Sequence, residues 1–563
     1  MFLPTTQQEM RALGWTDLDV ILVSGDTYID SPYIGVTIVG KVLVDAGYRV
    51  GIIAQPDIDS GSDITRLGKP RLFWGVTGGS IDSMVANFTA AKKRRRHGDY
   101  TPGGVNDRRP DRAVIAYVNL IKRFFKDTAP IVLGGLEASL RRIAHYDYWS
   151  NKVRRSVLFD AKADFLVHGM AEKTIVALAQ ALRHGESVQK ISGLCYISNE
   201  IPAGYLELPS YEIVRKDKYA FIEMFHTFYK NNDPKTARGL AQQQDTRYLV
   251  QNPPMSYLTQ SELDAVYALD YERDVHPYYK AQGKVRALAT LRSSVMTHRG
   301  CYGECNFCAI AMHEGRTVRW RSQDAIVGDV TQMAQTPGFK GYIQDLSGPT
   351  ANMYGYECEK KLNHGVCDHK RCVFPEICPQ LPVDHSPQTR LLQRLRYIPG
   401  VKKVFVASGL RYDLLLADKR HGNKYLREIV RYHVSGQMKV APEHTEDNVL
   451  DMMGKPSSRD LLEFRRRFFQ ETKAAGKKQF LTYYLIAAHP GCTERDMWKL
   501  KDFASRELNI HPEQVQIFTP LPSTYSSVMY YTELDPWTKK PIFVEKELGK
   551  KIYQKRIVVG KRR

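Results

Sequence analysis

The chain has 563 residues, of which 43% are hydrophobic and 25% are charged, and it carries a net charge of +20. This length predicts about three or four domain-sized units. No apolar run is long enough to cross a bilayer as a helix. The segment Met1–Glu9 lacks the basic region and the apolar core of a secretion signal. Together these features exclude membrane-spanning and disulfide-stabilised secreted proteins, and we expect a cytoplasmic protein.

The first 190 residues alternate between strand and helix patterns. Strands are predicted at Leu18–Val23, Tyr48–Ala54, Arg71–Val76, Pro130–Gly135 and Ala163–Val167. Helices are predicted at Gly35–Ala46, Ser80–Lys93, Val114–Phe125 and Glu172–Leu182. Repeated alternation of this kind is typical of α/β proteins. It predicts an N-terminal doubly wound parallel sheet with helices on both faces.

Residues 191–288 show a less regular pattern. They contain the turn sequence Asn231-Asn-Asp-Pro and the run Asn252-Pro-Pro-Met, both of which interrupt regular structure. We interpret this segment as an irregular connector with helices of its own.

The alternation resumes over residues 289–535. Strands are predicted at Ser293–Thr297, Gly341–Asp345, Lys403–Ala407, Met438–Ala441, Phe480–Ile486 and Val515–Thr519. Helices are predicted at Gln323–Met333, Gln388–Arg396, Tyr425–Tyr432, Asp460–Ala475 and Glu494–Arg506. Six such units predict a partial (β/α)6 barrel of the TIM type, in which loops after the strands carry the reactive groups. Residues 536–563 are basic and without an amphipathic pattern, so we expect a flexible tail.

Three cysteines in the loop after the first of these strands carry the strongest chemical signal. Cys301, Cys305 and Cys308 have the spacing Cys-x3-Cys-x2-Cys, and an aromatic residue, Phe307, precedes the third. Three thiolates can hold three irons of a [4Fe–4S] cluster and leave the fourth iron open. The amino and carboxylate groups of S-adenosylmethionine fit that position. One electron then cleaves the sulfonium and gives a 5′-deoxyadenosyl radical. The alternatives are a zinc site, with His298 or His313 as a fourth ligand, and a chance pattern.

Polar residues follow three successive strands of the predicted barrel. They are Asp345, Ser408 with Arg411 three residues later, and Glu443. Carboxylates and hydroxyls suit ribose and amine groups, and a cation suits a carboxylate. We therefore predict Asp345, Ser408 and Glu443 as cofactor contacts, with Phe307 near the adenine. Surface ion pairs are the alternative for Arg411 and Glu443.

A second set of cysteines lies in an insertion over residues 352–385. Its members are Cys358, Cys367, Cys372 and Cys378, with His364 and His369 between them. Four thiols in so short a segment predict either a zinc ion or an auxiliary iron–sulfur cluster. Four free thiols are the alternative.

The loop after the first strand also allows a comparison with cobalamin-binding domains. These use an Asp-x-His-x-x-Gly loop, whereas Asp30-Ser-Pro-Tyr-Ile-Gly35 has Pro32 in place of the histidine. This segment therefore offers no histidine as the lower axial ligand of the cobalt. Cobalamin is for this reason the less favoured of the cofactors considered.

Several longer stretches resemble the YgiQ family of radical S-adenosylmethionine (radical SAM) proteins. The stretches are Asp26–Pro56, Gly134–Trp149, Cys301–Cys308 and Val515–Pro522. The resemblance implies a family-specific N-terminal domain followed by a radical SAM domain, with the three cysteines of the loop as cluster ligands. The segment Ala487-Ala-His-Pro-Gly491 is also similar to methylthiotransferases that modify tRNA, but their separate three-cysteine domain and RNA-binding domain are missing.

These observations predict an enzyme that cleaves S-adenosylmethionine reductively and acts on an unidentified substrate. The basic charge makes RNA the leading substrate hypothesis, although an evenly solvated basic surface explains the charge at least as well. A reductant such as flavodoxin or ferredoxin is the expected partner. A non-catalytic iron–sulfur protein that transfers electrons or senses redox state is the alternative.

Overall fold

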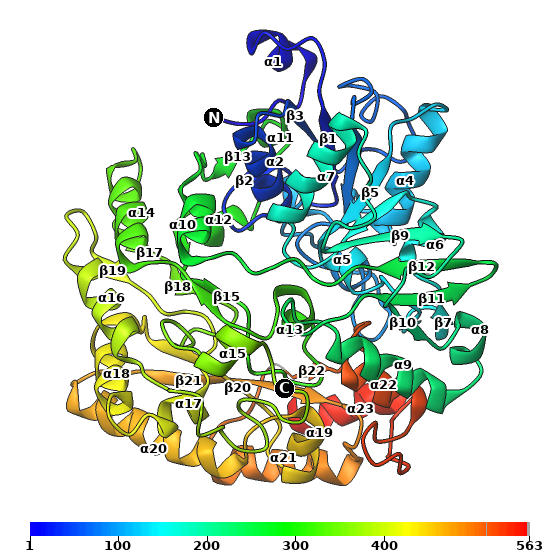
Figure 1. Cartoon of the computed structure of the whole chain (residues 1–563). Coiled ribbons are helices and arrows are strands. Elements are labelled where there is room, and N and C mark those ends of the chain that lie inside the picture. Colours follow the sequence, from blue (N-terminus) through cyan, green and yellow to red (C-terminus); the bar gives the residue numbers. More distant parts are fainter. Residues whose placement is uncertain (514, 560–563) are drawn as a thin grey trace. The chain divides into compact units, whose positions relative to one another are not determined.

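A computed structural model describes residues 1–513 and 515–559, which form two compact units (Figure 1). The first unit comprises residues 1–257 and 265–292, and the second comprises residues 258–264 and those from 293 onward. Helix α10 (Gln260–Ala268) contains the point where the chain passes from the second unit back to the first. No helix in the described part of the chain is long and apolar enough to span a bilayer.

The first unit is built on one nine-stranded sheet. Its strands, in spatial order, are β10 (Leu206–Leu208), β11 (Leu240–Gln244), β12 (Arg247–Gln251), β9 (Leu194–Ser198), β8 (Phe165–Val167), β5 (Ile131–Gly134), β4 (Phe73–Thr77), β1 (Val20–Ser24) and β3 (Val50–Ala54). The five strands from β8 to β3 are parallel, with Leu22 of β1 opposite Ile52 on one side and Gly75 on the other. Strands β1 and β3 are fully buried, as expected where both faces of a parallel sheet are covered. The predicted parallel α/β sheet is therefore confirmed.

Helices join these strands and cover the sheet. They are α1 (Gln7–Ala12), α2 (Gly35–Asp45), α3 (Ser83–Asn87), α4 (Ala113–Phe124), α5 (Gly135–Ser139), α6 (Val157–Ala161), α7 (Glu172–His184), α8 (Tyr211–Val214), α9 (Lys218–Lys230), α11 (Pro277–Lys280) and α12 (Leu288–Leu291). Helix α2 packs beside α7, and both contribute to one apolar core with β1 and β3. Helix α4 packs instead against α6 and β4.

Two sequence predictions for this unit differ from the structure. The segment 191–288 is no separate connector, because β9 to β12 extend the sheet by antiparallel pairing next to β8. The helix predicted at Ser80–Lys93 is shortened to α3. The helix ends at Asn87, whose side-chain amide donates to the Arg109 carbonyl oxygen. The next residue, Phe88, forms an antiparallel β-bridge with Arg94. In both cases tertiary pairing outweighs the local pattern.

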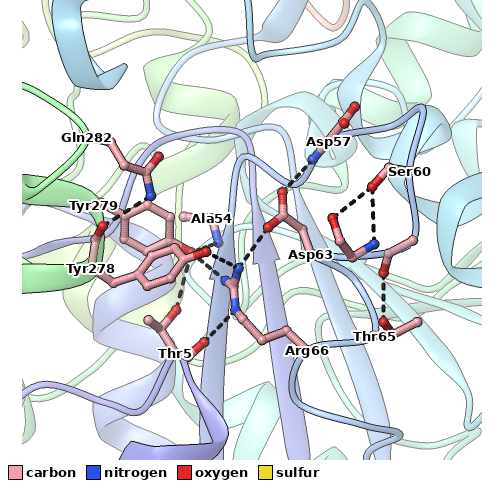
Figure 2. Close-up of polar contacts among 12 residues, drawn as sticks. Thr5, Ala54, Asp57, Ser60, Asp63, Thr65, Arg66, Tyr278, Tyr279 and Gln282 are labelled. Carbon is pink, nitrogen blue, oxygen red and sulfur yellow. Dashed lines mark hydrogen bonds and ion pairs between the residues drawn. The ribbon is translucent and has the colours of Figure 1, made fainter.

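Arg66 ties the returning segment 265–292 to the end of the edge strand β3 (Figure 2). Its guanidinium donates to the hydroxyl oxygens of Tyr278 at 2.8 Å and Tyr279 at 3.2 Å, and lies 4.4 Å from the Tyr278 ring centre. The same side chain donates to the Thr5 carbonyl oxygen at 2.7 Å. The amide of Ala54, the last residue of β3, donates to the Tyr279 hydroxyl at 2.8 Å. These contacts hold the N-terminal segment and the returning segment together at the carboxyl end of β3.

The second unit contains parallel strands at the six predicted positions. They are β14 (Ser294–Met296), the pair β17 (Tyr342–Ile343) and β18 (Asp345–Ser347), β19 (Lys403–Val404), β20 (Gln437–Glu443), β21 (Phe480–Ala487) and β22 (Gln516–Ile517). The strand pairs β14–β18, β17–β19, β20–β21 and β21–β22 are all parallel, and a parallel bridge joins Leu410 to Val440. Closure of these strands into a TIM-type barrel stays a prediction.

The α-helices described in the second unit include one at each of the five predicted positions and six that the sequence does not predict. They are α13 (Ile310–Glu314), α14 (Gln323–Gln335), α15 (Glu359–His364), α16 (Ser386–Arg396), α17 (Tyr412–Ala417), α18 (Gly422–Glu428), α19 (Asp447–Met453), α20 (Ser458–Ala474), α21 (Glu494–Arg506), α22 (Tyr525–Thr532) and α23 (Leu548–Val559). A short antiparallel pair, β15 (His298–Arg299) and β16 (Arg319–Trp320), frames the cysteine loop. One large apolar core lies between the strands and these helices.

The C-terminal segment is ordered where a flexible tail is predicted. Helix α23 buries Ile557 and Val558 and packs against α21, β21 and β22. Lys551 of this helix donates to the Tyr530 hydroxyl at 2.6 Å. The buried positions of α23 lie on one face of the helix, which explains why this segment is folded. The basic residues between them make this apolar face difficult to recognise in the sequence. Residues 560–563 lie outside the described part.

Candidate functional site

The three cysteines lie in a tight loop that begins directly after β15. Gly300 has φ 82°, and a side chain there would collide with the Thr317 carbonyl oxygen, so only glycine fits. The Cys301 amide donates to the Gly315 carbonyl oxygen at 3.1 Å, and the Cys308 amide donates to the Cys305 carbonyl oxygen at 3.0 Å. The loop is therefore closed at both ends by its own backbone.

The loop brings the three thiols together. The Gly303 amide donates to Cys301 Sγ at 3.4 Å, and a Cβ on Gly303 would lie 3.1 Å from Cys301 Sγ and 3.9 Å from Cys305 Sγ. Burial raises the pKa of Cys301 and of Cys308, and the charge of Cys305 raises both further. Three thiolates at this spacing repel one another, so a cationic group bound between them would stabilise all three.

The three thiols do not have the close spacing of ligands to a single metal ion. In the described residues no three His, Cys, Asp or Glu side chains are close enough to share one metal ion. In a cluster each thiolate binds a different iron, so the sulfurs stand farther apart than the ligands of one zinc. The structure thus gives no support to a zinc ion, either at this loop or at the second cysteine set.

Arg411 supplies a positive charge beside the thiols. Its Nη1 donates to Cys305 Sγ at 3.8 Å, and its Nε donates to both carboxylate oxygens of Asp413, at 3.0 and 3.2 Å. The pair is buried, and the charges of Asp413, Cys305 and Cys301 keep the pKa of Arg411 above its usual range. The surface ion pair considered as an alternative for Arg411 is therefore wrong, because the residue faces the cysteine loop.

Two of the predicted cofactor contacts bind each other. Asp345 Oδ1 accepts from the amides of Ala407 at 2.8 Å and Ser408 at 3.2 Å, and the Ser408 hydroxyl donates to Asp345 Oδ2. The carboxylate of β18 thus fixes the end of the neighbouring strand. Ser408 still has free acceptor capacity on its hydroxyl.

Glu443 and Phe307 lie on the Cys308 side of the loop. Glu443 ends β20 with φ 69°, its side chain is buried, and burial raises its pKa while Lys455 lowers it. Its charge acts on the Cys308 thiol, so the two groups are neighbours. Phe307 packs edge-to-face against His489 with ring centres 6.2 Å apart.

Asn306 and His489 complete the surroundings of the loop. The Asn306 amide donates to the Met453 carbonyl oxygen at 2.8 Å, and its side chain donates to the Met452 carbonyl oxygen at 2.9 Å, which anchors the loop to α19. The Ser526 amide of α22 donates to the Asn306 carbonyl oxygen at 2.9 Å. His489 Nε2 lies 2.7 Å from Ser526 Oγ. The segment around His489 has a recognisable sequence pattern, whereas Asn306 has none that predicts its role.

In the first unit, the carboxyl ends of β1 and β4 meet at the point where the strand order reverses. Ligands of doubly wound sheets bind at this point. Here Arg109 fills it, donating from Nε to the Gly25 carbonyl oxygen at 2.9 Å and pairing with Asp26. Gln55 donates to the same carbonyl oxygen at 3.0 Å. The Arg109 and Asp26 side chains are 5% and 1% exposed, so no open crevice lies between them.

Comparisons with known proteins identify the family of the chain. A family model described as Radical SAM N-terminal matches residues 2–294. A UPF0313 protein of Fusobacterium nucleatum is 58% identical over 563 residues, covering 100% of this chain and 99% of the relative. A UPF0313 protein of Thermotoga maritima is 48% identical, with coverages of 100% and 99%. The chain belongs to the UPF0313 family. This is the YgiQ family that the sequence resembles, so that prediction is confirmed.

As a UPF0313 member the chain is an enzyme of the radical SAM superfamily with an unspecified reaction. Two solved structures share its fold. One is the radical SAM methyltransferase TsrM from Kitasatospora setae with cobalamin and a [4Fe–4S] cluster bound, at TM-score 0.53 and 14% identity, covering 92% of this chain and 78% of that one. The other is the cobalamin-dependent enzyme OxsB with aqua-cobalamin bound, at TM-score 0.52 and 12% identity, with coverages of 92% and 55%. At such identities the likeness concerns the fold alone.

Proposed function

We propose that Cys301, Cys305 and Cys308 hold a [4Fe–4S] cluster at which S-adenosylmethionine is cleaved reductively. The observation that carries the proposal is the approach of the Cys301 and Cys305 sulfurs to Gly303 and the Arg411 guanidinium, with Cys308 hydrogen-bonded through its amide to Cys305 in the same loop. When bound, the cluster supplies the electron that splits S-adenosylmethionine into methionine and a 5′-deoxyadenosyl radical. That electron comes from an external reductant such as flavodoxin or ferredoxin. The radical then takes a hydrogen atom from the substrate.

The surrounding residues have separate roles in this proposal. Arg411 lowers the electrostatic cost of assembling negative charge at Cys301 and Cys305. Glu443, held in a strained conformation at the end of β20, accepts hydrogen bonds from the ribose hydroxyls. Phe307 packs beside the adenine. Asp345 positions Ser408, whose hydroxyl oxygen accepts from the methionine amine.

Anaerobic reconstitution followed by reduction with dithionite tests the proposal. We expect 5′-deoxyadenosine from the wild-type protein and none from the triple variant Cys301→Ala, Cys305→Ala, Cys308→Ala. The matched control is Cys195→Ala, because Cys195 is buried in the sheet of the first unit. A wild-type protein with a full complement of iron that still releases no 5′-deoxyadenosine would overturn the proposal.

Cobalamin is the second cofactor to consider. Both solved structures named above contain it, which gives it more weight than the sequence did. In this chain, however, the residues at the strand reversal do not fit a corrin ring. Arg109, Asp26 and Gln55 fill that point and hydrogen-bond to its backbone. We therefore expect no change in the absorption spectrum of hydroxocobalamin on titration with the protein. A stoichiometric spectral change would contradict this expectation.

The substrate class stays open within this proposal. RNA remains a prediction that rests on the net charge of +20, and no named relative or solved structure is described as acting on RNA. Comparing modified nucleosides and metabolites between a deletion strain and its parent is the experiment that identifies the substrate. A modified nucleoside missing from the deletion strain would support RNA.

A further inference from the structure

The insertion over residues 352–385 is unusual for a segment inside a compact unit. It contains only one helix, α15, and no named strand. Long segments without secondary structure are uncommon in compact domains and are usually functional. Four of the nine cysteines of the chain lie in it, at Cys358, Cys367, Cys372 and Cys378. The loop has a small apolar cluster of its own, and metal binding would add folding free energy to a segment of this kind.

The four thiols of the insertion gather in one region. Cys358 is buried in a small apolar cluster with Val373 and Leu381, and Cys372 packs against the same cluster. The Cys378 amide donates to the Cys372 carbonyl oxygen at 2.8 Å. Lys370 bonds to the Cys378 sulfur and interacts electrostatically with Cys367 and Cys372. Cys358 and Cys372 share the apolar cluster, the backbones of Cys372 and Cys378 are hydrogen-bonded, and Lys370 interacts with the sulfurs of Cys367, Cys372 and Cys378.

The insertion also packs on the three-thiol loop. Arg371 Nη1 donates to the Glu304 carbonyl oxygen at 3.1 Å, between Cys301 and Cys305 in the chain. Lys361 donates to the Arg316 carbonyl oxygen at 2.6 Å and lies 5.2 Å from the centre of the Tyr302 ring. Cys301 itself packs against the apolar cluster that contains Cys358. The two cysteine sets thus belong to one packed part of the second unit.

The donor set limits the metal groups that four cysteines can hold. A zinc ion needs its ligands around one point, and no three such side chains of the described residues meet that condition. A cubic cluster distributes four thiolates over four irons and so accepts a wider spacing. Thiolate-only donor sets favour iron–sulfur clusters and zinc over harder ions. Of these two, we favour the cluster, because the insertion packs on the three-thiol loop, where a second electron carrier would be useful.

We propose that Cys358, Cys367, Cys372 and Cys378 ligate a second [4Fe–4S] cluster. With four protein thiolates it has no open iron, so it carries electrons and binds no S-adenosylmethionine. It accepts one electron from the external reductant and passes one electron to the centre at the three-thiol loop, which leaves it oxidised as before. The electron-carrying role rests on the proposed function, whereas ligation of a cluster by these four thiols involves different residues and is tested separately.

Counting iron, sulfide and zinc in full-length variants tests the second cluster. The loop variant replaces Cys301, Cys305 and Cys308 by Ala, the insertion variant replaces Cys358, Cys367, Cys372 and Cys378 by Ala, and Cys195→Ala is the control. We expect about eight irons per chain in the wild type and in the control, and about four in each multiple variant. A loop variant without iron, or with zinc in its place, overturns the second cluster. An insertion variant without iron overturns the proposed function instead.

A milder substitution covers the case in which the insertion variant fails to fold. Cys378 is partly exposed, so Cys378→Ser leaves the apolar cluster intact. In the loop variant background, we expect Cys378→Ser to lower the iron content or to change the electron paramagnetic resonance spectrum of the reduced protein. An unchanged iron content together with an unchanged spectrum overturns the assignment of Cys378, and with it the four-thiolate cluster.

Discussion

Arg411 Nη1 donates a hydrogen bond to Cys305 Sγ at 3.8 Å while its Nε binds the carboxylate of Asp413. The guanidinium thus stands between a thiol that becomes negative on binding iron and a carboxylate that is negative throughout. A cation at this position stabilises the reduced, more negative state of the centre. The counter-ion opposes that effect, so the two side chains have opposite influences on reduction.

Replacing Arg411 should therefore make the centre harder to reduce. Arg411→Met removes the cation and leaves the Asp413 carboxylate buried, and we expect the midpoint potential to fall by about 60 mV or more, a tenfold change in the one-electron equilibrium. Asp413→Asn should raise the potential, because it removes the opposing charge. Redox titration monitored by electron paramagnetic resonance measures both. Shifts of the same sign in the two variants would refute the electrostatic role.

Glu443→Gln should weaken the binding of S-adenosylmethionine. A hydrogen bond to a charged group contributes about 1.5–3 kcal/mol, which corresponds to a loss of roughly ten- to a hundredfold in affinity. Calorimetric titration of the reconstituted protein measures this loss. Glu446→Gln is the matched control, because Glu446 pairs with Lys499 at 2.8 Å. Equal affinities in the two variants would remove Glu443 from the binding site.

Asn306→Ala should loosen the cysteine loop without removing a ligand. The side-chain bond to the Met452 carbonyl oxygen at 2.9 Å is lost, at a cost of about 1–3 kcal/mol. We expect iron to be released several times faster to a chelator than from the wild type. The test is the rate of bleaching of the iron–sulfur absorption. A wild-type rate would mean that Asn306 does not hold the loop.

Arg66→Met should destabilise the first unit by about 2–4 kcal/mol, because it removes hydrogen bonds to Thr5, Tyr278 and Tyr279 together with the ring contact (Figure 2). Arg49→Met is the control, since its ion pair with Asp17 is exposed. Urea unfolding curves give both free energies of unfolding. If the two variants lose equal amounts, Arg66 does not anchor the returning segment.

His145 should make stability depend on pH. Burial, with a smaller contribution from Arg141, lowers its folded-state pKa from 6.5 to about 4. Between these two values the unfolded chain binds the proton more readily, so the free energy of unfolding falls as the pH falls, by up to about 1.4 kcal/mol per pH unit. We expect His145→Gln to reduce this loss between pH 6.5 and 4. Denaturant unfolding at pH 8 and pH 5 checks it, and an unchanged difference between the two pH values would be evidence against the prediction.

The sequence predicts the elements of both units where periodicity is strong. Helix α21 begins and ends as predicted, and the six strand positions of the second unit are all present. The prediction fails where long-range pairing decides, as in β11 and β12, whose polar glutamines resemble a loop. The spacing of Cys301, Cys305 and Cys308 indicates the cluster loop directly. Its neighbour Asn306 gives no signal, because a backbone anchor requires only a well-placed amide.

The return of residues 265–292 to the first unit affects how this domain is synthesised and dissected. A protein ending at residue 257 would leave the ribosome without Tyr278 and Tyr279, so the Ala54 amide would lose its bond to Tyr279 and Arg66 would keep only its contacts with Thr5 and Asp63. Folding of the first unit must wait until the returning stretch has emerged. A fragment for biophysical work should therefore extend to residue 292. In chimeras that exchange the N-terminal half between relatives, the junction should lie beyond residue 292.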